Sequence, residues 1–199
     1  MKTIILGMGN TLLSDDGIGI ITKRYLQQRL GEVNNIDCCE TSWGGFKIID
    51  LLKGYDYAII IDSIKTGLKP MGFIHFLEPS DLLPTLRLTS YHDINFITAI
   101  KLANQLQEKI PANINILAIE IGNNNTISEN IDPALWDSIY KCSEKIIHLL
   151  KSHKIIRNEL YNIKPINSIY EINELYKEDS LEHSTEPNQK FNQLEEYLA

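Results

Sequence analysis

Three residues in this chain combine side chains and positions that suit metal chemistry. Asp16 follows an apolar segment and a glycine turn, Asp62 terminates an apolar run, and His92 enters a predicted helix. In an open α/β sheet, ligands bind outside the carboxyl ends of the strands, where we expect all three residues. Two carboxylates and an imidazole predict a divalent-metal site with mixed oxygen and nitrogen ligands and open coordination positions. A helix N-terminus favours the carboxylate and keeps the histidine neutral, and both effects assist metal binding.

The loop that carries Asp16 resembles a nucleotide-binding turn but lacks one of its features. An apolar segment leads into Gly7-Met8-Gly9-Asn10-Thr11-Leu12, and Leu12 stands where the nucleotide fingerprint has its third glycine. Asp15 and Asp16 then occupy the place where a phosphate needs bare amide donors. The loop therefore predicts a metal or a cationic substrate. Within it we expect Asp15 to cap the next helix, Asn10 to hold the turn, and Asp16 to be the ligand.

The other polar residues near this edge have structural interpretations beside functional ones. Asp62 can be a helix cap or turn former, and His92 can be a partly buried histidine beside a cap. Glu40 and Glu120 end predicted strands, where each can reach the site or be a solvated strand end. The loop 41–45 contains Trp43 between polar and glycine residues, which fits either a contact surface or a loop with a core tryptophan. Three histidines receive no site role: His75, His148 and His153.

The hydrophobic pattern predicts an α/β fold, a three-layer sandwich around a twisted, mostly parallel five-stranded sheet with helices on both faces. Strands are expected at 3–6, 35–40, 58–61, 72–77 and 114–121, with 72–77 as an edge. Helices are expected from Asp15 or Asp16 to Leu30, after Gly44-Gly45, after the capping box at 90–93, and from Asp132-Pro133 to about Leu150.

The amino-acid composition argues against some classes of binding partner and distinguishes a folded domain from a polar C-terminal extension. The net charge of -7 disfavours a nucleic-acid binder, and the sequence has no apolar run of membrane-spanning length, so we expect a cytoplasmic protein without a membrane partner. Cys38, Cys39 and Cys142 lack the spacing of a zinc site and are expected to be buried thiols. We predict a domain over 1–151 and a polar, acidic extension over 152–199, helical at about 168–177 and otherwise disordered.

Several motifs together resemble the nickel-iron hydrogenase maturation proteases. They are the glycine loop with Asp15-Asp16-Gly17, the segment Ile60-Ile61-Asp62-Ser63-Ile64, the segment Ser90-Tyr91-His92-Asp93 and, more loosely, Ala118-Ile119-Glu120-Ile121. They occur in the family's order and spacing from residue 1 to about 151, so the resemblance is more specific than any single motif.

The resemblance implies a function and roles for the three candidate residues. A member of this family is an aspartic-type endopeptidase that removes the C-terminal extension of the hydrogenase large-subunit precursor after nickel insertion. The family's metal-contacting residues fall on Asp16, Asp62 and His92, with nickel brought by the substrate. Either the metal or a carboxylate can activate the attacking water. We expect a monomer, and the alternative function is a non-catalytic α/β metal-binding module or nickel chaperone.

Overall fold

The structure, a computed structural model of the chain, describes residues 1–42, 46–79, 96–122 and 125–156, and for residue 46 and residues 96–98 it describes the backbone. Its strands are β1 (Thr3–Met8), β2 (Ile36–Thr41), β3 (Tyr57–Ile64), β4 (Ile74–Leu77) and β5 (Asn113–Glu120). Its helices are η1 (Ser14–Gly17), α1 (Ile18–Leu30), α2 (Phe46–Leu52), α3 (Phe96–Gln105), η2 (Pro133–Leu135) and α4 (Trp136–Ser152), where η1 and η2 are 3-10 helices.

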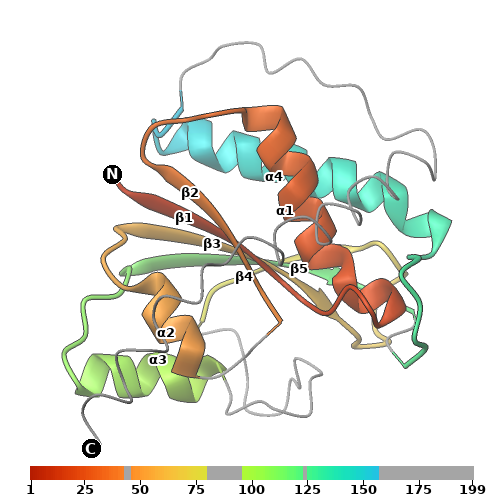
Figure 1. The fold of residues 1–199 in the computed structure, drawn as a ribbon, viewed down its shortest axis with the longest axis horizontal. Helices are drawn as coiled ribbons and strands as arrows, with labels where there is room; N and C mark the ends of the chain where they lie inside the picture. The colour runs from red at the N-terminus through yellow and green to blue at the C-terminus, as the bar shows by residue number, and fades with distance from the viewer. Residues whose placement is uncertain (43–45, 80–95, 123–124, 157–199) are drawn as a thin grey trace, which may run out of the picture.

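The strands form one sheet of five in the order β2-β1-β3-β5-β4 (Figure 1). The pairs β1–β2, β1–β3 and β3–β5 are parallel, whereas β4 pairs antiparallel with β5 at the edge. The central strands are buried on both faces, which explains why their sequences are near-continuous apolar runs. The predicted mostly parallel five-stranded sheet is confirmed, including the edge strand at the end of 72–77.

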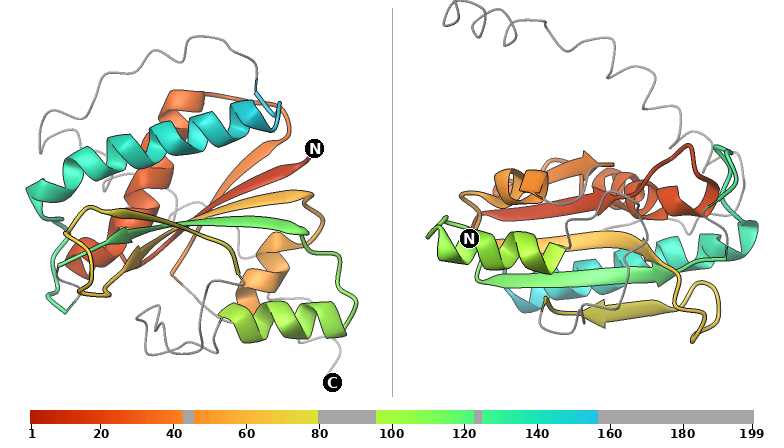
Figure 2. Two further views of the ribbon diagram at one scale, coloured as in Figure 1. Left: turned by 180° about the vertical axis from the view of Figure 1, so that it is seen from behind. Right: turned by 90° about the horizontal axis from the view of Figure 1, so that it is seen from below.

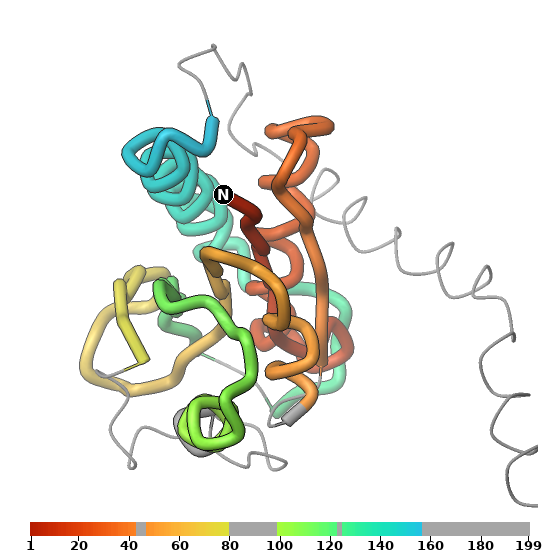
Figure 3. The backbone as a smooth tube through the Cα atoms, turned by 90° about the vertical axis from the view of Figure 1, so that its left-hand side faces the viewer, coloured from red at the N-terminus to blue at the C-terminus, as the bar shows by residue number. Residues whose placement is uncertain are grey.

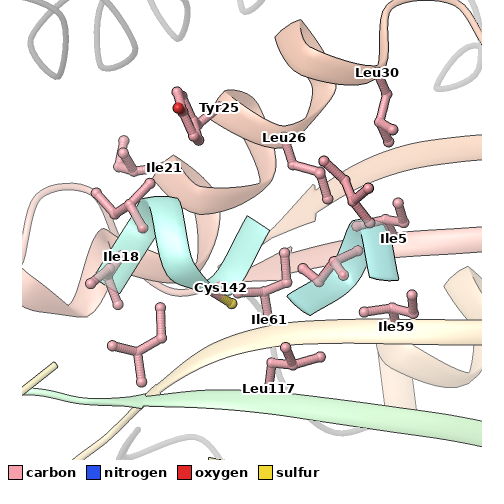
Figure 4. Packing of buried hydrophobic residues seen from close by; sticks show 14 of the residues in the cluster. Ile5, Ile18, Ile21, Tyr25, Leu26, Leu30, Ile59, Ile61, Leu117 and Cys142 are labelled. Carbon is pink, nitrogen blue, oxygen red and sulfur yellow. The ribbon is translucent and has the colours of Figure 1, made fainter. Parts of the chain in front are cut away.

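Helices cover both faces of the sheet (Figures 1 and 2). α1 and α4 lie on one face, where their apolar side chains pack on residues such as Ile59, Ile61 and Leu117 (Figure 4). α2 and α3 lie on the other face, where the core contains Ile48 and Leu52 of α2. In the side view of Figure 3, the green tube of α3 and the cyan tube of α4 lie on opposite sides of the strands. The predicted three-layer sandwich is therefore confirmed.

The helix boundaries follow from local signals in the sequence. α1 ends at Gly31, whose φ of 60° suits glycine, and its predicted inward residues are all buried: Ile18, Ile21, Tyr25 and Leu26. At the other covering helix, the Asp132 side chain accepts a hydrogen bond from the Ala134 main-chain nitrogen at 2.8 Å. Pro133 follows at the first helical position, as predicted, although this first turn is 3-10 before α4 begins.

The described part of the chain also bears on the predictions about cysteines and membrane spans. Its three cysteines are free; Cys142 is fully buried, and burial raises the pKa of its thiol to about 12, whereas Cys38 and Cys39 are half-buried. Among the described residues, no helix is both long enough and apolar enough to cross a bilayer. The core extends to Ile156, slightly beyond the predicted domain end. The capping box at 90–93 and the predicted helix at 168–177 lie outside the described residues.

A close helix–sheet contact places the start of α1 directly on the carboxyl end of β1 and on the backbone of β3 at Ile61. A β-carbon on Gly19 would overlap the main-chain oxygen atoms of Met8 and Ile61. These oxygens belong to the backbone of the sheet and cannot rotate away as a side chain would. The contact therefore requires glycine and fixes how near α1 comes to this edge.

We predict that Gly19→Ala lowers the free energy of unfolding. Overpacking against backbone costs about 3 kcal/mol, and the better helix propensity of alanine returns about 1 kcal/mol, so the net loss is about 2 kcal/mol. Urea unfolding followed by far-UV circular dichroism measures it. Gly122→Ala is the control, because a β-carbon there meets the flexible end of the Met71 side chain at 3.1 Å. An unchanged midpoint for Gly19→Ala would contradict the close contact.

Candidate functional site

The loop between β1 and η1 folds back on the sheet edge through a glycine and an asparagine. Gly9 has a φ of 139°, a conformation that favours glycine, and a β-carbon there would overlap the main-chain oxygen of Asp16. Asn10 accepts a hydrogen bond on Oδ1 from the Leu12 main-chain nitrogen at 3.0 Å. This side-chain turn confirms the expected role of Asn10. The loop thus brings η1, which carries Asp16, against the end of β1.

The Asp16 carboxylate is half-buried and is held through both of its oxygen atoms. Oδ2 accepts from the main-chain nitrogen of Asn10 at 3.0 Å, and Oδ1 accepts from the hydroxyl of Ser63 at 2.9 Å. The first donor belongs to the glycine loop, and the second belongs to β3, 47 positions away in the chain. Asp16 is therefore fixed at the junction of β1 and β3, and its role as a metal ligand stays a prediction.

Asp62 lies on β3 next to the residue that holds Asp16. Its Oδ1 accepts a hydrogen bond from the main-chain nitrogen of Ser63 at 2.8 Å, and the side chain is half-buried. Because side chains alternate along a strand, Asp62 shares its face with Ile60 and Ile64, which pack on the α2 side. Ser63 is on the α1 side and donates to both carboxylates. Asp16 and Asp62 therefore share Ser63 as a donor, Asp16 through its hydroxyl and Asp62 through its main-chain nitrogen.

Sequence reasoning missed Ser63 as a site residue. The sequence could have indicated Ser63, because it directly follows Asp62 in a strand. Strand alternation turns the Ser63 side chain toward the face on which η1 carries Asp16. The hydroxyl group can donate to a carboxylate, and the residue is buried, with 4% of its surface exposed. The resemblance included Ser63 in a motif but gave it no role.

The prediction that Asp15 caps the first helix is wrong. Neither η1 nor α1 has a side-chain hydrogen bond at its N-cap, and α1 begins at Ile18 with Gly17 as its N-cap. Asp15 is instead buried, and its Oδ1 accepts from the Asp132 main-chain nitrogen at 2.9 Å. Asp15 therefore ties η1 to the segment that begins η2. Its structural role still separates it from Asp16, as the sequence analysis proposed.

His92, the third candidate ligand, lies outside the described residues. Among the residues that are described, no group of three histidine, cysteine, aspartate or glutamate side chains could hold a metal ion. The described part of the site is therefore the pair of carboxylates at Asp16 and Asp62. Carboxylate oxygens suit divalent cations, and a pair of them leaves further coordination positions to other groups. The role of His92 stays a prediction. Trp43, Gly44 and Gly45, the residues of interest in the 41–45 loop, also lie outside the described residues.

Glu40 is an ion-paired residue and not the solvated strand end considered from the sequence. Arg24 donates to both of its carboxylate oxygens, from Nε at 2.8 Å and from Nη2 at 2.7 Å. The Nζ of Lys23 lies 2.5 Å from Oε1, and both cations are buried. Burial by itself raises the pKa of Glu40, but the hydrogen bonds and charges of Arg24 and Lys23 outweigh burial and lower the pKa. Glu40 therefore fastens α1 to the end of β2.

Glu120 is likewise a buried anchor, which corrects its interpretation as a solvated strand end. It accepts hydrogen bonds from the main-chain nitrogens of Thr66 and Gly67 at 2.7 and 2.8 Å and from the Thr66 hydroxyl at 2.7 Å. The Nε2 of His75 lies 2.9 Å from its Oε2, so His75 has a structural partner. Burial raises the pKa of Glu120, but these hydrogen bonds outweigh it and lower the pKa. Glu120 thereby holds the loop that follows Asp62 and Ser63.

Comparison with known sequences agrees with this architecture. A sequence profile described as hydrogenase maturation protease matches residues 20–149, which run from α1 to α4. The chain belongs to the hydrogenase maturation protease family. The match includes Asp62 and His92 and begins four positions after Asp16. The recognition made from the sequence motifs is thereby confirmed.

Individual members of the family are distant relatives of the chain. The hydrogenase expression/formation protein HupD of Thiocapsa roseopersicina is 21% identical over 157 residues, which cover 78% of this chain and 70% of that protein. The hydrogenase 2 maturation protease of Escherichia coli K12 is 24% identical over 144 residues, which cover 68% of this chain and 87% of that protein. As a member of this family of proteases, the chain is an endopeptidase, a hydrolase of peptide bonds.

Solved structures share the fold. The hydrogenase maturating endopeptidase HybD from Escherichia coli superposes with a TM-score of 0.66 at 19% identity and covers 77% of this chain and 94% of its own. The maturation protease HycI from Thermococcus kodakarensis gives a TM-score of 0.56 at 18% identity and covers 75% of this chain and 92% of its own. The α/β sheet described above is therefore the fold of this protease family.

We predict that Glu120→Gln lowers the free energy of unfolding at neutral pH by about 2 kcal/mol, because hydrogen bonds to a charged acceptor are replaced by bonds to a neutral one. The pKa of Glu120 is lowered on folding, so its ionised form stabilises the fold above the ordinary value of 4.5. That stabilisation is lost as the pH falls below 4.5 and then past the lowered pKa of the folded state, because the Glu120 carboxylate becomes protonated. The difference in free energy of unfolding between Glu120→Gln and the original protein should therefore shrink as the pH falls below 4.5.

Urea unfolding at several pH values measures this difference. Glu32→Gln, a change at an exposed glutamate, is the matched control and should leave the free energy of unfolding within about 0.5 kcal/mol of the original. A Glu120→Gln variant as stable as the original protein at neutral pH would show that the carboxylate does not anchor the 65–72 loop.

Proposed function

We propose that this endopeptidase removes the C-terminal extension of a nickel-loaded nickel-iron hydrogenase large-subunit precursor. The observation that carries the proposal is the pairing of Asp16 and Asp62 through Ser63 at the carboxyl edge of the sheet. Membership of the family of hydrogenase maturation proteases gives the reaction class. In this proposal the substrate binds at the carboxylate pair, at the carboxyl edge of the sheet.

Nickel enters this proposal as a part of the substrate and serves as the element that is recognised. Asp16, Asp62 and the predicted ligand His92 supply two carboxylates and one imidazole, which are fewer than the four ligands of a closed structural site. Cysteine thiolates of the precursor fill the remaining positions. A precursor without nickel then lacks the group that the carboxylates bind, so cleavage follows nickel insertion.

The chain's own residues have two jobs in the proposed reaction. Asp16 and Asp62 hold the nickel-loaded end of the precursor so that its scissile peptide bond lies at the sheet edge, where orientation lowers the barrier. A carboxylate at this edge also has the chemistry to accept a proton from the attacking water. This assignment corresponds to the aspartic-type classification that the motifs imply. The proposal keeps the expectation of a cytoplasmic monomer without a nucleic-acid or membrane partner.

The decisive experiment mixes the full chain with nickel-charged and nickel-free precursor and follows both by intact mass spectrometry. We expect a shortened large subunit and a released C-terminal peptide from the charged precursor alone. Unchanged masses for both precursors would contradict the proposal. Tight nickel binding without any cleavage would instead support the nickel chaperone.

We predict that Asp16→Ala, Asp62→Ala and His92→Ala each slow cleavage at least about 100-fold, the scale of losing a positioned acid–base or ligand group. Asp137→Ala is the matched control, because Asp137 is an exposed aspartate that pairs with Lys141 on α4. It should cleave at the original rate. Normal cleavage by all three site variants would exclude the proposed site.

A further inference from the structure

Ser63 differs from the other buried serines in the partner of its hydroxyl group. The other buried serines donate to main-chain oxygens: Ser138 and Ser143 to residues three positions earlier, at Leu135 and Tyr140, and Ser14 to Asn130. The Ser63 hydroxyl donates across the fold to the Asp16 carboxylate. Its hydroxyl therefore bonds to the side chain of a candidate site residue and not to the main chain.

The donors around Asp16 and Asp62 are of two kinds. The main-chain nitrogen of Asn10 donates to Asp16 Oδ2, and the main-chain nitrogen of Ser63 donates to Asp62 Oδ1. These donors belong to the backbone and do not depend on the side chains at positions 10 and 63. The Ser63 hydroxyl at 2.9 Å from Asp16 Oδ1 depends on the side chain. Without it, Asp16 loses the bond that ties its carboxylate to β3, while the bond from Asn10 remains.

We propose that Ser63 is a positioning residue that sets the orientation of the Asp16 carboxylate relative to Asp62 for binding nickel. This inference rests on the proposed function, because it assigns Asp16 to the nickel of the substrate. Hydrogen bonds to a ligating carboxylate restrict its rotation and orient its lone pairs, and losing such a partner weakens metal binding about 10- to 100-fold. Ser63 acts through Asp16 and Asp62 and does not itself contact the reacting bond.

The test measures Ni²⁺ binding to the full chain by isothermal titration calorimetry, without precursor. We expect Ser63→Ala to raise the dissociation constant for Ni²⁺ at least about 10-fold. Ser63→Thr keeps the hydroxyl and should bind within about threefold of the original, whereas Ser63→Cys, similar in size but a weak donor, should lie between them. Ser138→Ala removes a buried hydroxyl elsewhere and should leave the Ni²⁺ affinity unchanged.

Urea unfolding of every variant separates a positioning role from a structural one. If Ser63 only stabilised the fold, Ser63→Ala would lower the free energy of unfolding, and Ser63→Thr would not restore the Ni²⁺ affinity. Original affinity in a folded Ser63→Ala variant would overturn the inference, as would equal losses in folded alanine and threonine variants. Absence of Ni²⁺ binding by the original protein would also overturn it. The precursor cleavage assay judges the proposed function separately, because it needs no affinity of the free protein for Ni²⁺.

Discussion

The close approach of the η1–α1 segment to the sheet is the constraint on which the site depends. Gly9 and Gly19 leave no room for a β-carbon, because the main chain of Asp16 lies against Gly9 and the main chains of Met8 in β1 and Ile61 in β3 lie against Gly19. This contact brings an acidic 3-10 turn within hydrogen-bonding distance of β3. The Ser63 hydroxyl can reach Asp16 only because the backbones are this near.

The acidic residues at the carboxyl edge fall into two groups by their partners. Glu40 is held by Arg24 and Lys23, and Glu120 by Thr66, Gly67 and His75, so both fasten neighbouring elements. Asp16 and Asp62 instead meet at Ser63. The first group makes the edge rigid, since it fixes α1 and the loop after β3. A rigid edge allows the second group to keep one geometry, which the proposed recognition of a metal-loaded substrate requires.

Much of this arrangement was predictable from the sequence because it depends on local patterns. Apolar runs predicted the strands, and Asp132-Pro133 predicted the start of the last helix. The glycine loop placed Asp16, and the end of the apolar run placed Asp62, near one edge. Residues that depend on distant partners were not predictable: Glu40, Glu120 and His75 are defined by contacts between segments far apart in the chain.

Two errors have specific physical causes. Asp15 was expected to be a cap because it precedes an apolar helix, but the 3-10 turn moves the start of α1 to Ile18 and turns Asp15 toward Asp132. Ser63 was overlooked because a serine in an apolar strand is easily taken as a neutral core residue. Strand alternation beside Asp62 contained the missing information, since it places Ser63 on the side of α1.

Crystals of the full chain soaked with Ni²⁺ and measured at the nickel absorption edge test the central claim most directly. The account predicts an anomalous peak in bonding contact with carboxylate oxygens of both Asp16 and Asp62. A well-occupied peak elsewhere on the protein, with none between these two residues, would contradict the claim that they form the nickel-recognition site.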